Sequence, residues 1–303
     1  MLDAITTPAM HARLAQLREQ DPNFETLYCI LGPERILEWA HSVGVSSDHK
    51  LRDLAPEVPP HALRSIVAAP SESIFLWSGL KDAQMLAAYI DRHVPDRRGR
   101  TVEVLDFGCG CGRTTRFLQN LSLTRVHGTD INQALVGWCQ FYLPAVNTTL
   151  NGSEPSLAFG DRAFDFIYSL SIFTHLPEKV MQGWLVELAR ITADHGIVLL
   201  TTHGYPAIDT ISNSPQHQQM FQLSGDGAEK LRSDFDRDGF VYHRYTPDVI
   251  DQANAGDDYD NSFTHEDYIR RHWHGDLFEV VEFVPGGMRG WQDLTMLRRR
   301  PRA

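Results

Sequence analysis

The ten residues from Val104 to Arg113, Val-Leu-Asp-Phe-Gly-Cys-Gly-Cys-Gly-Arg, decide the fold of this chain. A strand-like apolar run closes at this segment and a helical pattern opens after it, so the glycines are predicted to form a tight strand-to-helix turn. Because glycine has no Cβ atom, the backbone there can turn sharply and approach a ligand closely. The segment therefore predicts a ligand-binding loop in an α/β fold.

The spacing of the glycines separates this loop from a dinucleotide-binding fingerprint. Gly108, Gly110 and Gly112 follow G-x-G-x-G, and Arg113 stands where the dinucleotide pattern places its third glycine or alanine. Asp106, two residues before the first glycine, would repel a pyrophosphate and suits a cationic or amine-bearing ligand. A nicotinamide-dependent oxidoreductase stays open as an alternative, which this spacing disfavours.

Downstream of the loop, short apolar runs alternate with helical periods. We predict strands over residues 101–107, 125–130, 164–170 and 196–202, and helices over residues 113–121, 132–143 and 177–191. This alternation predicts an α/β fold with a doubly wound, mostly parallel, Rossmann-like sheet covered by helices on both faces. Residues 277–299 contain two strand-like runs joined by a glycine-bearing turn, which predicts an antiparallel C-terminal edge strand.

Upstream of the loop the pattern is helical, with one helix predicted around residues 80–94, and the polar stretch at residues 95–100 predicts a boundary. Residues 1–98 are predicted to form an N-terminal helical cap, and residues 99–303 the ligand-binding domain. Within that domain, residues 203–276 form a long polar insertion after the strand predicted over 196–202. A connection of this length rarely lacks structure, so we expect a lid or substrate-recognition element at the ligand-binding edge of the sheet.

A second acidic residue ends the strand that follows the loop. Asp130 lies 24 residues after Asp106, at the end of Arg-Val-His-Gly-Thr-Asp. Its two carboxylate oxygens are suited to the two hydroxyls of a ribose, and an acid at this second strand end is common in nucleoside-binding α/β folds.

With these residues in place, the sequence resembles the class I S-adenosylmethionine-dependent methyltransferases. The resemblance rests on D-x-G-x-G-x-G at 106–112, on Asp130, on FDFIYSLSIFTHLPE at 164–178 and on the C-terminal hairpin. It covers roughly residues 100–303 and implies S-adenosylmethionine as cofactor. The segments LDFGCGCGR, SIFTHLPE, LLTTHG and WQDL are similar to a bacterial subgroup that acts on small molecules.

The resemblance also implies a set of cofactor-binding residues. The glycine loop would contact the methionine part, with Asp106 near its amino group, Asp130 on the ribose and Ile131 over one face of the adenine. Asn151 and Gly152 would line the adenine edge. The complete expected set is Asp106, Gly108, Cys109, Gly110, Gly112, Asp130, Ile131, Asn151, Gly152 and Ser169.

Two histidines are the candidate catalytic residues. His175 follows the strand predicted over 164–170 and His203 follows that over 196–202, both at the edge where the activated methyl should lie. Histidine titrates near neutral pH and suits removal of a hydroxyl proton, although each could instead be a structural turn histidine. Together with the absence of an N/D-P-P-Y motif, they favour O-methylation of a small metabolite, such as a sugar or a secondary-metabolite intermediate. N-methylation of a small amine and a non-catalytic cofactor-binding scaffold stay open.

Composition limits the partners of the chain. The 28 basic and 39 acidic residues among 303 leave a net charge of −11, which disfavours nucleic acid, so we expect a small-molecule methyl acceptor. No run of about eighteen apolar residues and no signal peptide are present, so we expect no membrane partner and a cytoplasmic protein. The four cysteines fit a reducing compartment, and homodimerisation stays open.

No metal site is predicted, although two segments resemble one. Cys109 and Cys111 have C-x-C spacing, but zinc needs more converging ligands. Residues 234–239 read D-x-D-x-D-G, the opening of a calcium loop, yet its twelfth position is Tyr245 where the bidentate glutamate would stand. We expect a solvated acidic turn there.

Overall fold

The computed structural model describes residues 8–22, 24–26, 28–29, 58–94, 99–244, 260–273 and 275–301. The chain forms two compact units. Unit one comprises Met1–Val102 and Cys109–Thr149, and unit two comprises Glu103–Gly108 and Leu150–Ala303. The polar stretch at residues 95–98, where the chain was predicted to divide, lies outside the described residues.

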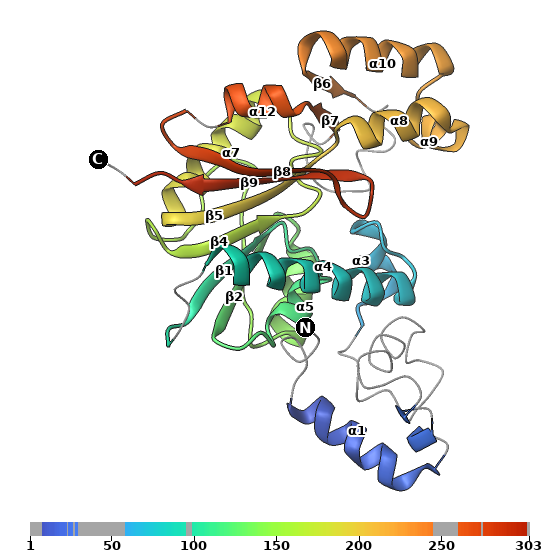
Figure 1. The fold of residues 1–303 in the computed structure, drawn as a ribbon, viewed down its shortest axis with the longest axis vertical. Helices are drawn as coiled ribbons and strands as arrows, with labels where there is room; N and C mark the ends of the chain where they lie inside the picture. Colours follow the sequence, from blue (N-terminus) through green and yellow to red (C-terminus); the bar gives the residue numbers. More distant parts are fainter. Residues whose placement is uncertain are drawn as a thin grey trace. The chain divides into compact units, whose positions relative to one another are not determined.

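Seven strands form one sheet in the order β3-β2-β1-β4-β5-β9-β8 (Figure 1). Their bounds are β1 Val102–Phe107, β2 Thr124–Asp130, β3 Asn147–Leu150, β4 Phe164–Ser169, β5 Thr192–Thr202, β8 Phe278–Met288 and β9 Gln292–Arg299. Strand β4 pairs in parallel with both β1 and β5, whereas β9 pairs antiparallel with β5 and β8. The predicted α/β fold with an antiparallel C-terminal hairpin is therefore confirmed, with β8 as the edge strand.

Unit one contains the N-terminal helices and the helices that follow the glycine loop. They are α1 Pro8–Gln20, α3 His61–Ile66, α4 Glu72–His93, α5 Thr115–Leu118 and α6 Gln133–Tyr142. Helix α4 begins eight residues before the pattern that starts at Leu80, because Phe75 and Leu76 continue its buried face toward the N-terminus. Helix α5 is shorter than the helix predicted over 113–121, since residues 111–114 form turns after the glycines.

In unit two, helices α7 (Glu178–Ile191) and α12 (Glu266–His272) pack on the same face of the sheet (Figure 1). Trp184 and Leu188 of α7 and Ile269 of α12 share a buried core with Ile167 of β4 and Val198 of β5. These α7 residues are spaced at helical intervals, so one apolar stripe faces the strands. Helices α7 and α12 therefore cover β4 and β5 on this face.

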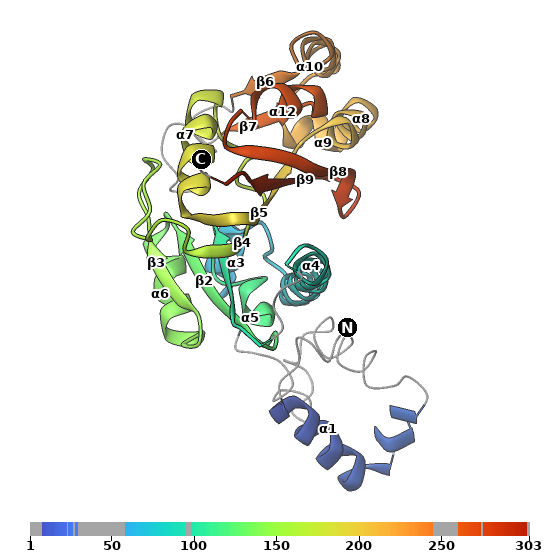
Figure 2. The ribbon, with the colours of Figure 1, turned by 60° about the vertical axis from the view of Figure 1, so that its left-hand side comes forward.

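The described part of the 203–276 insertion has a core of its own. It contains α8 Tyr205–Asn213, α9 Pro215–Met220, α10 Gly225–Asp238, β6 Phe240–His243 and β7 Asn261–Thr264, with α8, α9 and α10 gathered together (Figure 2). Ile208, Phe235 and Phe263 are among the buried side chains that join these elements. The acidic turn expected at 234–239 is wrong, because Asp234 to Asp238 end helix α10 and only Gly239, at φ +74°, leaves the helical conformation.

Within the described ranges, every helix is too short or too polar to cross a membrane.

Candidate functional site

Asp130 holds the second half of the glycine loop in unit one. Its Oδ2 accepts a hydrogen bond from Gly110 N (2.8 Å) and its Oδ1 accepts one from Asn132 N (2.8 Å). Burial raises the pKa of Asp130, and hydrogen bonds from the backbone N–H groups of Asn132, Gly110 and Ile131 oppose that shift. Each carboxylate oxygen has further lone pairs, so Asp130 can hold the loop and still accept a hydrogen bond from a ligand hydroxyl.

Gly110 is held in a backbone conformation and a space that exclude a side chain. Its φ is +54°, in the left-handed region, and a Cβ atom there would lie 2.6 Å from Val67 Cγ1. Val67 follows α3, so the chain just before α4 lies against the loop. Both the conformation and the contact require glycine at this position.

The loop cysteines are buried free thiols. Cys109 N donates a hydrogen bond to Thr129 O (3.0 Å), so the start of the loop stays paired with the end of β2. Cys111 Sγ donates to Leu63 O (3.8 Å). Burial raises the pKa of Cys111 to about 12, so its thiol stays protonated. These side chains fill space beneath the loop.

Arg113, the residue that breaks the dinucleotide pattern, joins the loop to α4. Its Nη1 donates to Asp82 Oδ2 (2.5 Å) and to Ser78 Oγ (3.0 Å), and the Asp82 side chain is only 2% exposed. A Cβ atom on Gly79 would lie 2.0 Å from the Arg113 carbonyl oxygen, so the α4 backbone itself packs on the end of the loop. A buried ion pair thus connects the N-terminal helices to the predicted cofactor loop.

In unit two, β4 holds the residues that precede the loop. Tyr168 OH donates to Asp106 Oδ2 (2.7 Å), and Ser169 Oγ donates to Phe107 O (2.9 Å). Asp106 is buried and Ser169 completely so. The Ser169 hydroxyl is thus engaged inside the sheet, whereas the Asp106 carboxylate is oriented by a neutral phenol and keeps acceptor capacity.

The remaining predicted cofactor residues lie nearer the surface. Ile131 is 37% exposed, so part of its side chain is available to cover a flat ligand. Asn151 is half-buried and its Nδ2 donates to the carbonyl of the exposed Gly152 (2.8 Å).

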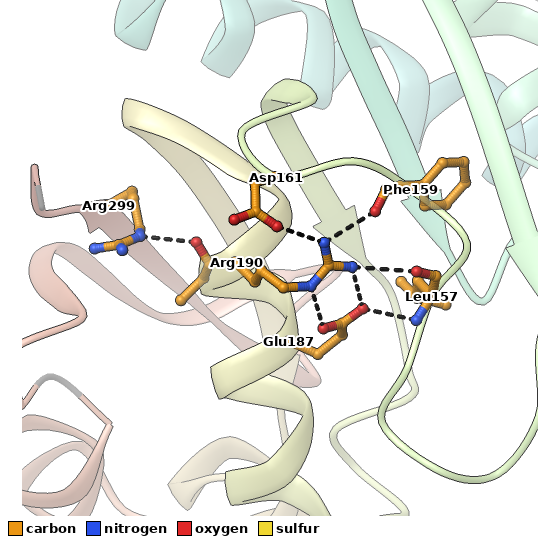
Figure 3. A network of polar contacts seen from close by, with 7 residues as sticks. Leu157, Phe159, Asp161, Glu187, Arg190 and Arg299 are labelled. Atoms are coloured by element: carbon orange, nitrogen blue, oxygen red, sulfur yellow. Dashed lines mark hydrogen bonds and ion pairs between the residues drawn. The ribbon is translucent and has the colours of Figure 1, made fainter.

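The segment that follows Asn151 and Gly152 is anchored by Arg190 of α7 (Figure 3). Arg190 donates to both carboxylate oxygens of Glu187 (2.7 and 2.8 Å), to Phe159 O (2.9 Å) and to Asp161 Oδ1 (2.8 Å). Glu187 also accepts from Leu157 N (2.6 Å). This network attaches the chain entering β4 to the last turn of α7.

The two candidate catalytic histidines lie near each other in unit two. Their ring centroids are 6.3 Å apart. Burial lowers the pKa of His175 to about 4 and that of His203 to about 3, so both rings are neutral at physiological pH. His175 Nδ1 donates to Asp260 O (2.6 Å), whereas His203 Nδ1, on a residue only 4% exposed, has no hydrogen-bond partner among the described residues.

Strand β7 of the insertion crosses the ends of β4 and β5. Ser262 N donates to Thr174 O (2.8 Å) and Thr264 N donates to His203 O (2.8 Å). Phe263 packs on His203, with ring centroids 5.3 Å apart. The returning strand therefore covers both histidines, which the sequence patterns alone did not indicate.

Residues at the start of β9 complete this edge of unit two and were not among the predicted site residues. Gln292 bonds the hydroxyl of Ser171 (3.0 Å), and Ser171 has a positive φ of +62°. Asp293, next in the chain, is 3% exposed, and burial raises its pKa to about 6. Asp293 lies in the late WQDL segment that contributed to the family resemblance, and no other sequence pattern points to it.

The raised pKa of Asp293 predicts a pH-dependent stability difference. The folded state holds this proton more tightly than the unfolded state, so wild-type stability should fall as pH rises from about 4 to about 6. Relative to Asp293→Asn, the loss should be at most about 3 kcal/mol. Thermal unfolding of both proteins between pH 4 and 8 measures the difference. Parallel dependence of their stabilities on pH would refute the raised pKa of Asp293.

Among the described residues, no group of three or more His, Cys, Asp or Glu side chains is placed to hold a metal ion.

A comparison with known protein families finds a match in the central part of the chain. Residues 104–196 match the family model described as a methyltransferase domain. A sterol 24-C-methyltransferase of Gibberella zeae is 25% identical over 138 residues, which cover 43% of this chain. The matched region spans only 35% of that relative's length. The match confirms a methyltransferase domain over residues 104–196, and the subgroup stays a prediction.

Two solved methyltransferase structures also match this chain, each with a TM-score below 0.5. A methyltransferase from Methanosarcina mazei is 16% identical, with 69% of this chain and 97% of that chain covered and a TM-score of 0.47. The 1,6-didemethyltoxoflavin N1-methyltransferase of Burkholderia thailandensis, solved with its substrate and S-adenosylhomocysteine, is 16% identical. There the coverage is 82% of this chain and 93% of that chain, with a TM-score of 0.48.

Proposed function

We propose that this chain, which carries a methyltransferase domain over residues 104–196, transfers the methyl group of S-adenosylmethionine to a small molecule. The observation that carries the proposal is the glycine loop held by Asp130 through Gly110 N. A side-chain-free backbone next to a buried carboxylate with spare lone pairs fits a ligand that carries hydroxyls and a cationic centre.

The residues suit this cofactor at both ends of the loop. Asp106 is a buried carboxylate whose hydrogen-bonding neighbour, Tyr168, is neutral, so its charge can attract an amino group. Asp130 would accept the ribose hydroxyls and Ile131 would cover the adenine. Gly108, Cys109, Gly110 and Gly112 would contact the methionine part, with Asn151, Gly152 and Ser169 completing the proposed set. When bound, S-adenosylmethionine supplies a methyl group on a positively charged sulfur.

The protein's own contribution is to place the acceptor and exclude water. In-line transfer requires the acceptor atom about 3 to 3.5 Å from the methyl carbon. The neutral His203, with its unpartnered Nδ1, and the nearby His175 are suited to orient a hydrogen-bond donor such as an acceptor hydroxyl. We therefore favour O-methylation of a small metabolite, with the 203–276 insertion as the element that covers the acceptor.

Asp130→Ala tests the cofactor assignment directly. Loss of its hydrogen bonds should release the loop and remove a ligand contact, so S-adenosylmethionine binding should weaken at least about 30-fold, or about 2 kcal/mol. Isothermal titration calorimetry measures this, with Asp226→Ala in the first turn of helix α10 as the control. Absence of saturable binding to the wild type, or equal affinity in Asp130→Ala, would contradict the proposal.

The thiols support a cytoplasmic location for the proposed reaction. All four cysteines are free, and Cys109, Cys111 and Cys139 are buried, which fits the reducing cytoplasm. The net charge of −11 supports a small molecule over nucleic acid as the acceptor.

A further inference from the structure

Asp293 lies at the acceptor edge of unit two, on β9 directly opposite Thr202 at the end of β5. Its Oδ1 accepts a hydrogen bond from Gly286 N of the β8–β9 hairpin (2.8 Å). Its Oδ2 occupies the space above Gly204, where a Cβ atom would lie only 1.8 Å away. The carboxylate therefore rests on the backbone that immediately follows His203.

This carboxylate has no cation beside it. No Lys, Arg or His within the described ranges forms an ion pair with Asp293, and the charged group that acts on it is the carboxylate of Glu266 in α12, which is repulsive. A buried charge with one backbone hydrogen bond is unfavourable unless a ligand or a proton compensates it. Burial raises the pKa of Asp293 to about 6, which makes it a stronger base than an ordinary aspartate and leaves it ionised at pH 7.

Two unpartnered hydroxyls lie on the same face of these strands. Thr202 is the cross-strand partner of Asp293, and Thr295 is two residues further along β9, so all three side chains point to one face. Both threonines are fully buried, and neither Oγ1 has a hydrogen-bond partner among the residues that the structure describes. Buried polar atoms without partners are rare and mark places where a ligand or water is missing. They provide a second, independent indication of a polar ligand group at this edge.

The histidines are poorer candidates for taking a proton here. Their pKa values of about 4 and about 3 make His175 and His203 weak bases, although both remain able to form hydrogen bonds. Efficient proton acceptors have a pKa closer to the working pH. Among the titratable groups at the ends of β4 and β5 and the start of β9, Asp293 meets that condition best.

We propose that Asp293 receives the proton of the methyl acceptor, with Thr202 as a positioning residue beside it. The acceptor oxygen forms a bond to the methyl carbon while its O–H proton passes to the Asp293 carboxylate. The methyl carbon–sulfur bond breaks and its electron pair stays on sulfur, which becomes a neutral thioether. The products are a methyl ether, S-adenosylhomocysteine and protonated Asp293, which then releases its proton to water. This inference rests on the proposed methyltransferase function and assigns its acceptor to the hydroxyl class.

The test uses methyl-labelled S-adenosylmethionine with a panel of phenols and monosaccharides as acceptor probes. For the probe that the wild type methylates fastest, kcat is measured from pH 5 to 9 in wild type, Asp293→Asn and Gly204→Ala. Asp293→Asn should lower kcat about 10²- to 10⁴-fold and remove the acidic limb of the profile near pH 6, with cofactor affinity unchanged. Gly204→Ala, whose methyl would displace the carboxylate, should lower kcat as well.

Asp194→Asn is the control, because Asp194 is a carboxylate of β5 that pairs with Arg162 and is not among the proposed cofactor or acceptor residues. An Asp293→Asn enzyme with wild-type kcat and an unchanged acidic limb would overturn the inference. Loss of cofactor binding in Asp293→Asn would also overturn the inference, because it would show that the role of Asp293 is structural. A wild type that binds no S-adenosylmethionine would instead refute the methyltransferase proposal itself.

Discussion

Substitution of Gly110 by alanine should weaken S-adenosylmethionine binding by at least about 100-fold, or about 2.7 kcal/mol. The added methyl meets Val67 at 2.6 Å, and a positive φ of +54° disfavours any residue with a Cβ atom. Both effects shift the Gly110 N–H away from Asp130 and so alter the loop that faces the ligand. Calorimetric titration with the cofactor measures the loss.

Gly137→Ala is the control for this prediction. Gly137 lies in helix α6, where no atom would contact an added Cβ, so alanine should leave binding unchanged and stabilise the helix by about 0.5–1 kcal/mol. The double variant Gly110→Ala with Val67→Ala separates the two causes. Recovered affinity would identify the contact with Val67 as dominant, and no recovery would identify the backbone conformation. Cofactor affinity in Gly110→Ala equal to that of Gly137→Ala would refute the loop assignment.

Removal of Asp82 should destabilise the protein by about 3–5 kcal/mol, because it leaves the Arg113 guanidinium without its buried carboxylate. Asp82 is 2% exposed and Arg113 is largely buried, so water replaces the lost partner poorly. Urea unfolding of Asp82→Ala, compared with wild type, measures the change in the free energy of unfolding. The same variant should lower cofactor affinity, since Arg113 ends the glycine loop.

An exposed ion pair provides the control. Lys230, which is 74% exposed, pairs with Asp234 on α10, and Lys230→Ala should change stability by no more than about 1 kcal/mol. Replacing both members of the buried pair, Asp82→Leu with Arg113→Met, should recover most of the stability that Asp82→Ala loses, because no charge is left buried. A loss in Asp82→Ala no larger than in Lys230→Ala would show that the buried pair contributes little.

Much of the candidate cofactor loop could be predicted because its signals are local. A glycine at every second position from 108 to 112, an acid before the loop and an acid ending the next strand are read directly from spacing. The α/β class follows in the same way, since buried strands and amphipathic helices have different periods. Boundaries were less accurate, as the early start of α4 and the short α5 show, because tertiary packing extends or shortens a helix beyond its local pattern.

The acceptor half could be predicted only in part. His175 and His203 were identifiable because each directly follows a predicted strand. Asp293 could not be identified in this way, because its local sequence does not differ from that of other polar residues in hairpins. Its burial depends on pairing with Thr202, on the missing side chain at Gly204 and on the hydrogen bond from Gly286 N of β8.

The fold class, the glycine loop and the two acids that flank it can be predicted from the sequence alone, because backbone freedom at glycine and the period of apolar residues are properties of short segments. The pairing of Arg113 with Asp82, the position of β7 beside the segments that follow β4 and β5, and the burial of Asp293 without a cation emerge only in the folded chain. The physical reason is that burial and charge pairing depend on which distant strands and helices meet, and no local pattern of residues encodes those partners.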